Sequence, residues 1–81
     1  MTVWLLLDWM EGGDSYTVEG VYASREGAVA AFQQIANQVI RDNADDPDTE
    51  VEVEWDSANS PVIYEGTGEW YFSIKKVAVN P

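Results

Sequence analysis

The chain has to be held together by side-chain packing alone, because its 81 residues include neither cysteine nor histidine. Disulfides and the zinc sites built from cysteine and histidine, which stabilise many small domains, are therefore excluded. A chain of this size buries only about 60% of the surface that it exposes when unfolded. The apolar fraction of 46%, with four tryptophans, is still enough for one core. We therefore expect residues 1–81 to form a single domain that folds without a cofactor.

Two β-strands and a helix are expected in the first half of the chain. Residues 2–10 and 16–23 are rich in β-branched and aromatic residues, and the turn-forming residues 11–15 lie between them, as is typical of a β-hairpin. Ser24 is a suitable N-cap and Glu26 falls in the first helical turn, where the helix dipole favours an acid. A helix is predicted over about 25–42. Its apolar stripe, expected to face the core, comprises Val29, Phe32, Ala36, Val39 and Ile40.

Three further strands are predicted after the helix. Residues 50–56 alternate acidic and apolar side chains, a pattern typical of a half-buried strand. Residues 57–61 predict a turn, 62–64 a short strand, 65–69 a hairpin loop and 70–79 a final strand. The expected fold is α+β with the element order β-β-α-β-β-β. It consists of a mostly antiparallel sheet and one amphipathic helix packed on one face.

The second face of this sheet is expected to be more apolar than an uncovered face usually is. Residues 3–7 are apolar on both sides of their strand, and Tyr71 lies between Trp70 and Phe72 in the last strand. One helix covers only one face, so an apolar second face needs another cover. Either loops and sheet curl provide it, or the protein forms a homodimer or binds a partner there. If Trp4 and Tyr71 lie on that face, we expect a dimer or a partner.

The net charge of −11 is concentrated in one segment. Residues 42–56 contain eight acids and no basic residue: Asp42, Asp45, Asp46, Asp48, Glu50, Glu52, Glu54 and Asp56. On a strand, which rises about 3.3 Å per residue, the last four of these would line one face about 7 Å apart. One interpretation is a solvated edge strand whose charges prevent aggregation. The other is a row of charges that resembles a nucleic-acid backbone and occupies a basic groove of a partner protein. The candidate partner-binding residues are Asp45, Asp46, Asp48, Glu50, Glu52, Glu54 and Asp56.

Enzymatic activity is not expected from this sequence. Histidine and cysteine are missing, and no phosphate-binding glycine loop or nucleophile motif occurs. Two carboxylates can hydrolyse a glycoside, but so small a domain offers little room for the cleft that this needs. A dedicated divalent-cation site at residues 42–50 is also not expected, because Pro47 stands where an EF-hand loop that began at Asp42 would need glycine.

The charge also bears on partners and location. A strongly acidic protein is repelled by nucleic acid and by anionic membranes and is attracted to basic surfaces. Direct binding to nucleic acid or to a membrane is therefore not expected. The apolar N-terminal run is interrupted at Asp8 and has no basic residue before it, so it is neither a signal peptide nor a membrane span. We expect a cytoplasmic protein.

Residues 20–28, Gly-Val-Tyr-Ala-Ser-Arg-Glu-Gly-Ala, resemble the strand-to-helix junction of small uncharacterised proteins of phages and actinobacteria. In size, acidity and lack of catalytic residues, the chain is also similar to phage-encoded inhibitors of host defence nucleases, of the anti-restriction and anti-CRISPR type. This second resemblance is one of physical class without a shared motif, so it assigns no residues. It implies a non-catalytic inhibitor that occupies a positively charged, nucleic-acid-binding surface. The alternative is a structural or regulatory module that dimerises or assembles through an aromatic sheet face.

Overall fold

The computed structural model describes residues 1–10 and 15–80 and has the predicted α+β architecture. The elements, in chain order, are β1 (Thr2–Met10), β2 (Thr17–Tyr22), α1 (Arg25–Asp42), β3 (Val51–Ser57), β4 (Ser60–Glu65) and β5 (Gly68–Ala78). The predicted order β-β-α-β-β-β is confirmed. Of the turn predicted over residues 11–15, residues 11–14 lie outside the described residues.

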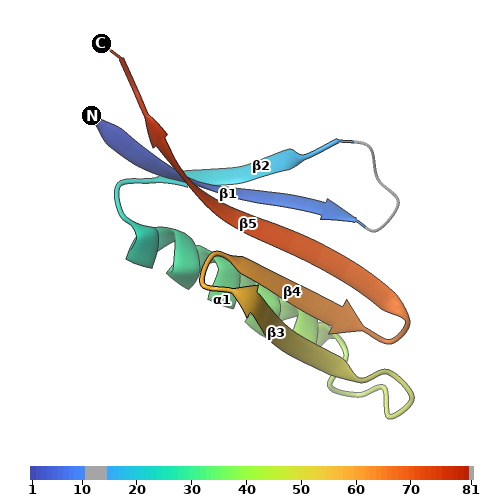
Figure 1. The fold of residues 1–81 in the computed structure, drawn as a ribbon. Helices are drawn as coiled ribbons and strands as arrows, with labels where there is room; N and C mark the ends of the chain where they lie inside the picture. The colour runs from blue at the N-terminus through green and yellow to red at the C-terminus, as the bar shows by residue number, and fades with distance from the viewer. Residues whose placement is uncertain (11–14, 81) are drawn as a thin grey trace.

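The five strands form one antiparallel sheet in the order β2-β1-β5-β4-β3 (Figure 1). The N-terminal hairpin and the C-terminal β3-β4-β5 meander meet where β1 pairs with β5, from Thr2 opposite Ala78 to Met10 opposite Trp70. These are the two longest strands, with β1 the most apolar stretch of the chain. Their pairing places β2 and β3 at the two edges of the sheet.

Helix α1 begins and ends as its sequence predicts. The Ser24 hydroxyl accepts a hydrogen bond from the Gly27 N–H at 3.1 Å, which satisfies one of the free donors of the first turn. Asn43 ends the helix: its Nδ2 donates to the Val39 carbonyl at 2.8 Å and to Glu65 Oε2 at 2.6 Å. The end of the helix is thereby tied to the end of β4.

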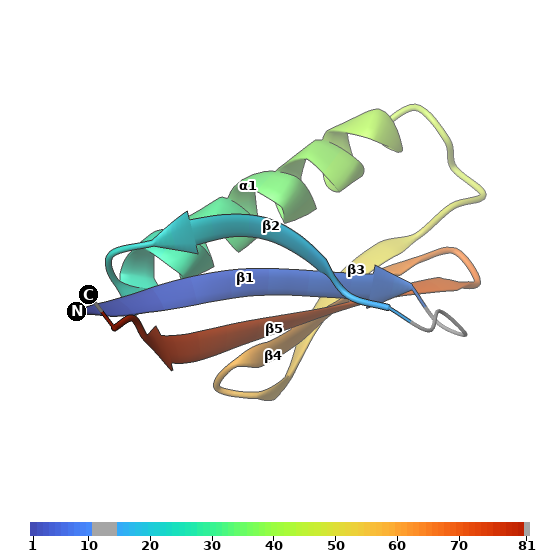
Figure 2. The ribbon, with the colours of Figure 1, turned by 90° about the horizontal axis from the view of Figure 1, so that it is seen from above.

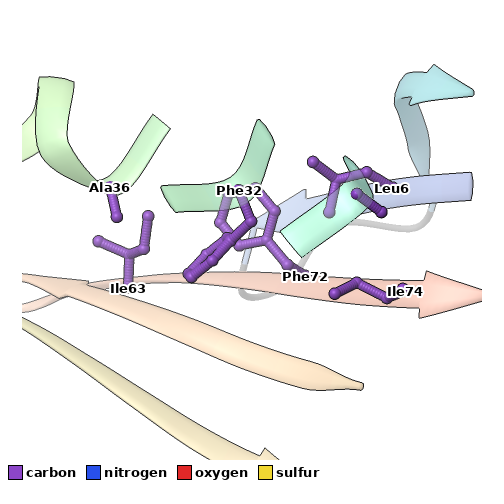
Figure 3. Close-up of a cluster of buried hydrophobic side chains, with 7 residues drawn as sticks. Leu6, Phe32, Ala36, Ile63, Phe72 and Ile74 are labelled. Carbon is purple, nitrogen blue, oxygen red and sulfur yellow. The ribbon is translucent and has the colours of Figure 1, made fainter. Parts of the chain in front are cut away.

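The core lies between α1 and one face of the sheet (Figures 2 and 3). The Phe32 ring contacts the Phe72 ring edge-on, with centroids 4.9 Å apart. The other buried members of the cluster are Leu6, Ala28, Ala36, Ile63 and Ile74. Full burial of a large apolar side chain contributes about 1.5–3 kcal/mol, so this cluster replaces the disulfides that the chain lacks.

The predicted apolar stripe of the helix is correct except at its last residue. Phe32 and Ala36 are buried and Val39 is half-buried, but Ile40 is exposed. At 3.6 residues per turn, Ile40 lies about 80° around the helix from Phe32. Ile40 therefore lies to one side of the helix face that contacts the sheet. Ala28, which the prediction omitted, lies about one turn before Phe32 on that face and is fully buried.

Trp4 and Tyr71 do not share a face of the sheet. Trp4 alternates with Leu5 and packs with Leu6 against the core beneath the helix. Tyr71 is the cross-strand partner of Trp9 and lies on the helix-free face. The condition under which a dimer or a partner was expected, with both residues on the uncovered face, is therefore not met, because Trp4 lies on the side of β1 that α1 covers.

The β3–β4 connection is tighter than predicted. The turn expected over residues 57–61 is confined to Ala58 and Asn59, and Pro61 lies within β4 opposite Trp55. The next turn is also short: Gly66, at a φ of 59°, adopts the left-handed conformation that glycine tolerates without strain. The meander is therefore compact, with long paired strands and short connections.

Candidate protein-binding face

The helix-free face of β3 carries a row of carboxylates at the edge of the sheet. Glu52, Glu54 and Asp56 are exposed. Strand alternation places Glu52 and Glu54 on the face away from α1. Asp56 lies at the register shift between Trp55 and Ser57, and its charge acts on Tyr64 of the same face. Their neighbours Val51, Val53 and Trp55 point to the helix side, where Val51 packs against the core and Trp55 meets Phe32. The spacing of about 7 Å predicted for residues 50–56 holds for Glu52 and Glu54, because Glu50 precedes β3 and Asp56 lies at the register shift.

Residues from the neighbouring strands extend the acidic row. Tyr64 pairs with Glu52 on one side and with Glu69 on the other, so the three side chains lie on one face. The pKa of the Tyr64 phenol is raised, first by burial and then by the negative charges of Glu54, Asp56 and Glu69. These carboxylates are thus close enough together to act on one group. Alternation within β3 could not reveal Glu69 and Tyr64, because they join the row only through strand pairing.

The loop acids form a separate group. Asp45, Asp46, Asp48 and Glu50 are exposed and precede β3. Asp46 organises the loop, since its Oδ1 accepts from the Asp48 N–H at 3.0 Å and its Oδ2 from the Thr49 hydroxyl at 2.7 Å. The bond from Thr49, followed by the bond from Asp48, lowers the pKa of Asp46. Among the described residues, no group of three or more acidic side chains is arranged to hold a metal ion.

The other half of the helix-free face is aromatic and apolar. Trp9 stacks on Tyr71 at a centroid distance of 5.7 Å and meets Tyr16 edge-on at 5.0 Å. The Tyr71 hydroxyl donates to Glu69 Oε2 and so connects this half to the acidic row. Val18 and Val21 of β2 remain 55% and 59% exposed. The second face is therefore only partly covered by its own side chains.

Asp8 is a buried carboxylate at the centre of the sheet, on the helix side. It is 6% exposed, and its Oδ2 accepts a hydrogen bond from Trp70 Nε1 at 2.8 Å. Within residues 1–10 and 15–80, no group donates a hydrogen bond to its Oδ1. The pKa of Glu19 is raised, mainly by a hydrogen bond to Asp8 and then by burial and by the charge of Asp8. When Glu19 is protonated, its carboxyl O–H supplies the hydrogen-bond donor that the Asp8–Glu19 pair otherwise lacks. Asp8 therefore has a role in stability that the sequence did not indicate.

A wide-open cleft of about 620 Å³ lies between α1 and the β3–β4 turn. Its apolar walls include Val29 of the helix and Trp55 of β3, and Arg25 lies at one end. The Arg25 guanidinium donates to Asn59 Oδ1 at 2.7 Å through Nε and to the Ala58 carbonyl through Nη2. Arg25 thus holds the β3–β4 turn against the start of the helix and shapes the cleft.

Comparison with protein-family models, curated proteins and solved structures finds no match to this chain. Among the described residues, no helix is both long and apolar enough to cross a membrane. Among the surfaces of the described residues, the acidic row of β3 is the most regular.

Proposed function

We propose that this protein is a non-catalytic binding protein that presents the acidic face of β3 to a positively charged surface of a partner, one that ordinarily binds nucleic acid. The observation that carries the proposal is the row Glu52, Glu54 and Asp56 on an edge strand, exposed and without a basic residue anywhere between Arg41 and Lys75. Such a row repels itself and is stabilised when cations of a partner neutralise it.

The position of the row favours contact with a large basic surface. In the described sheet β3 is an edge strand, so its carboxylates lie at the margin of the helix-free face. Glu69 extends the negative surface on the far side of Tyr64, and the loop acids precede the row in the chain. Binding of this kind inhibits stoichiometrically, by occupying the groove that a nucleic acid would use, and it fits the physical class of phage-encoded nuclease inhibitors.

The test is reversal of two charges on this face. The double variant Glu52→Lys/Glu54→Lys should fold normally, because both side chains point away from the core. Its matched control is Glu26→Lys/Asp42→Lys, which changes net charge equally through two exposed residues of α1. Proteins retained from a host lysate by the wild type are identified, and one that binds nucleic acid is purified.

Labelled nucleic acid bound to that purified protein is then competed with each variant. The wild type should displace the nucleic acid, and raised salt should weaken the competition. The β3 double variant should lose at least about tenfold in affinity, since like charges facing each other at an interface cost several kcal/mol. The α1 variant should lose much less. Equal loss in both variants would show that net charge, not the β3 row, governs binding.

A second candidate function is assembly through the aromatic half of the helix-free face. The exposed Val18 and Val21 beside the Trp9–Tyr71 stack favour it. Sedimentation equilibrium tests the simplest case: a homodimer that Val18→Asp/Val21→Asp dissociates would support assembly through this face. A wild-type monomer at all concentrations would remove the homodimer.

A further inference from the structure

β3 is an edge strand of the described sheet, so along one side its backbone groups have no neighbouring strand among the described residues. The Gly66 N–H donates to the Glu50 carbonyl at 2.9 Å. This bond shows which residues of β3 form the hydrogen-bonded pairs with β4. Hydrogen-bonded pairs alternate along antiparallel strands, so Glu52 and Glu54 direct their N–H and C=O groups toward β4. Val51, Val53 and Trp55 then direct theirs away from the sheet. Pro61 lies opposite Trp55, whose backbone groups point away from β4. Although proline has no N–H, it therefore costs the β3–β4 ladder no hydrogen bond.

The two faces of this edge differ in chemistry. On the helix side, Val53 is 37% and Trp55 is 41% exposed, and the cleft of about 620 Å³ opens between Trp55 and Val29. On the helix-free side stand the carboxylates of Glu52 and Glu54. A strand added beside β3 would therefore place alternate side chains against Val53 and Trp55, beside a cleft that Arg25, Gln33 and Ser57 also line, and against a negative row.

The other edge of the sheet is less suited to such an addition. The pairing of β2 with β1 shifts register at Leu6 and Leu7, where β2 carries Glu19 as an extra residue. Bulges of this kind interrupt an edge and discourage further pairing. β3 also shifts register, between Trp55 and Ser57, but that shift lies at the end of the strand and leaves Val51 to Trp55 in regular register. The carboxylates of β3 protect this edge from pairing with a second copy of the same strand, because like charges repel. The same carboxylates attract a basic strand.

We propose that β3 accepts an extended segment of a partner protein as a sixth strand, with apolar and basic side chains alternating along that segment. The apolar set enters the cleft between α1 and β3, and the lysines or arginines pair with Glu52, Glu54 and Asp56. Main-chain hydrogen bonds to Val51, Val53 and Trp55 provide the docking, as in other cases of strand addition. This inference rests on the proposed function and specifies the kind of partner and the way it binds.

The probe is a blocked peptide of about nine residues in which lysine and valine alternate, long enough to span β3. One control peptide has the same composition with all lysines in one block. A second has the alternating sequence with N-methyl groups on the backbone nitrogens that would face β3. The alternating peptide should bind at least about tenfold more tightly than either control, because each control loses several hydrogen bonds or contacts. The amides of Val51, Val53 and Trp55 should become protected from hydrogen exchange when it binds.

Protein variants give an independent check. Val53→Pro removes an outward N–H that the β3–β4 ladder does not use, and proline is tolerated at such edge positions, so this variant should fold and lose binding. Trp55→Ala should weaken binding while leaving the edge intact. The N-methylated peptide tests the same hydrogen bonds on the wild-type protein, so the test stands even if Val53→Pro does not fold.

The outcomes separate this inference from the proposed function. Equal binding of the alternating, block and N-methylated peptides, lost in Glu52→Lys/Glu54→Lys, would overturn strand addition and leave charge recognition standing. Selective binding of the alternating peptide that survives this charge reversal would support the main-chain pairing, but it would overturn the pairing of basic side chains with Glu52 and Glu54 and contradict the proposed function. No binding of the alternating peptide would overturn the inference.

Discussion

Replacement of Asp8 by asparagine is expected to stabilise the protein at neutral pH, although it changes a buried, hydrogen-bonded side chain. Asp8 Oδ2 accepts from Trp70 Nε1, while Oδ1 has no donor in the part of the chain that the structure describes and the Glu19 carboxyl lies nearby. Asp8→Asn keeps an acceptor for the indole. It also adds an amide N–H that can donate to the Glu19 carboxylate, so both sides of the group are satisfied.

The expected magnitude follows from two opposing effects. A hydrogen bond to a charged group contributes about 1.5–3 kcal/mol and a neutral one about 1 kcal/mol, so the bond to Trp70 weakens by about 1 kcal/mol. An unsatisfied buried polar atom costs about 1–3 kcal/mol, and a desolvated carboxylate costs more. Satisfying the unpaired oxygen alone should regain about 2 kcal/mol, the middle of the range for one such atom. The net gain of about 1 kcal/mol corresponds to a rise in Tm of about 4–8 °C for a domain of this size.

The pH dependence of stability distinguishes this explanation from a simple packing effect. The pKa of Glu19 is raised above its ordinary value of 4.5 in the folded protein. As pH falls from neutral, the folded state therefore binds this proton before the unfolded state does. The stabilisation is complete below the ordinary pKa and is lost as pH rises through the raised pKa. D8N should lack this contribution, because its amide does not need the proton.

Urea unfolding followed by circular dichroism, at neutral pH and at about pH 5, measures both effects. The remaining carboxylates titrate in both proteins, so the comparison concerns the difference between them. The stability advantage of D8N should be largest at neutral pH and should shrink as the pH falls. A D8N variant that is less stable than the wild type at neutral pH, or a difference that does not change with pH, would refute the carboxyl-pair argument.

Three further predictions concern the core, the helix and the charge. Phe32→Ala should cost about 3–5 kcal/mol in urea unfolding because it opens a cavity beside Phe72, whereas Gln33→Ala, on the exposed side of the helix, should stay within about 0.5 kcal/mol. Ser24→Ala should cost about 1 kcal/mol by removing the N-cap, and Ser24→Asp should restore most of it; a full loss in Ser24→Asp would contradict the capping role. Moderate salt should raise the Tm by screening the net charge of −11, and a calorimetric Tm that does not change from low to physiological ionic strength would count against self-repulsion.

Several parts of the fold followed from the sequence because they depend on neighbouring residues. The helix at 25–42 has its N-cap, first-turn acid and apolar spacing within one segment, and α1 spans Arg25–Asp42. The strand at 50–56 alternates without interruption, and β3 spans Val51–Ser57. The acidic row on one face of that strand was predictable for the same reason, since side-chain period alone places Glu52 and Glu54 together.

The tertiary structure decided which strands are neighbours and which face the helix covers. The two-residue period of a strand places Trp4 and Leu6 on the same side of β1. Only the packing of α1 against that side makes it the core. The insertion of β5 between β1 and β4 joins Asp8 to Trp70, 62 residues away, and brings Glu69 to the acidic row. These contacts form only when distant segments close long loops and bury apolar surface together. The local sequence pattern does not predict these contacts. The edge position of β3, on which both proposals depend, is therefore known only from the strand order of the folded sheet.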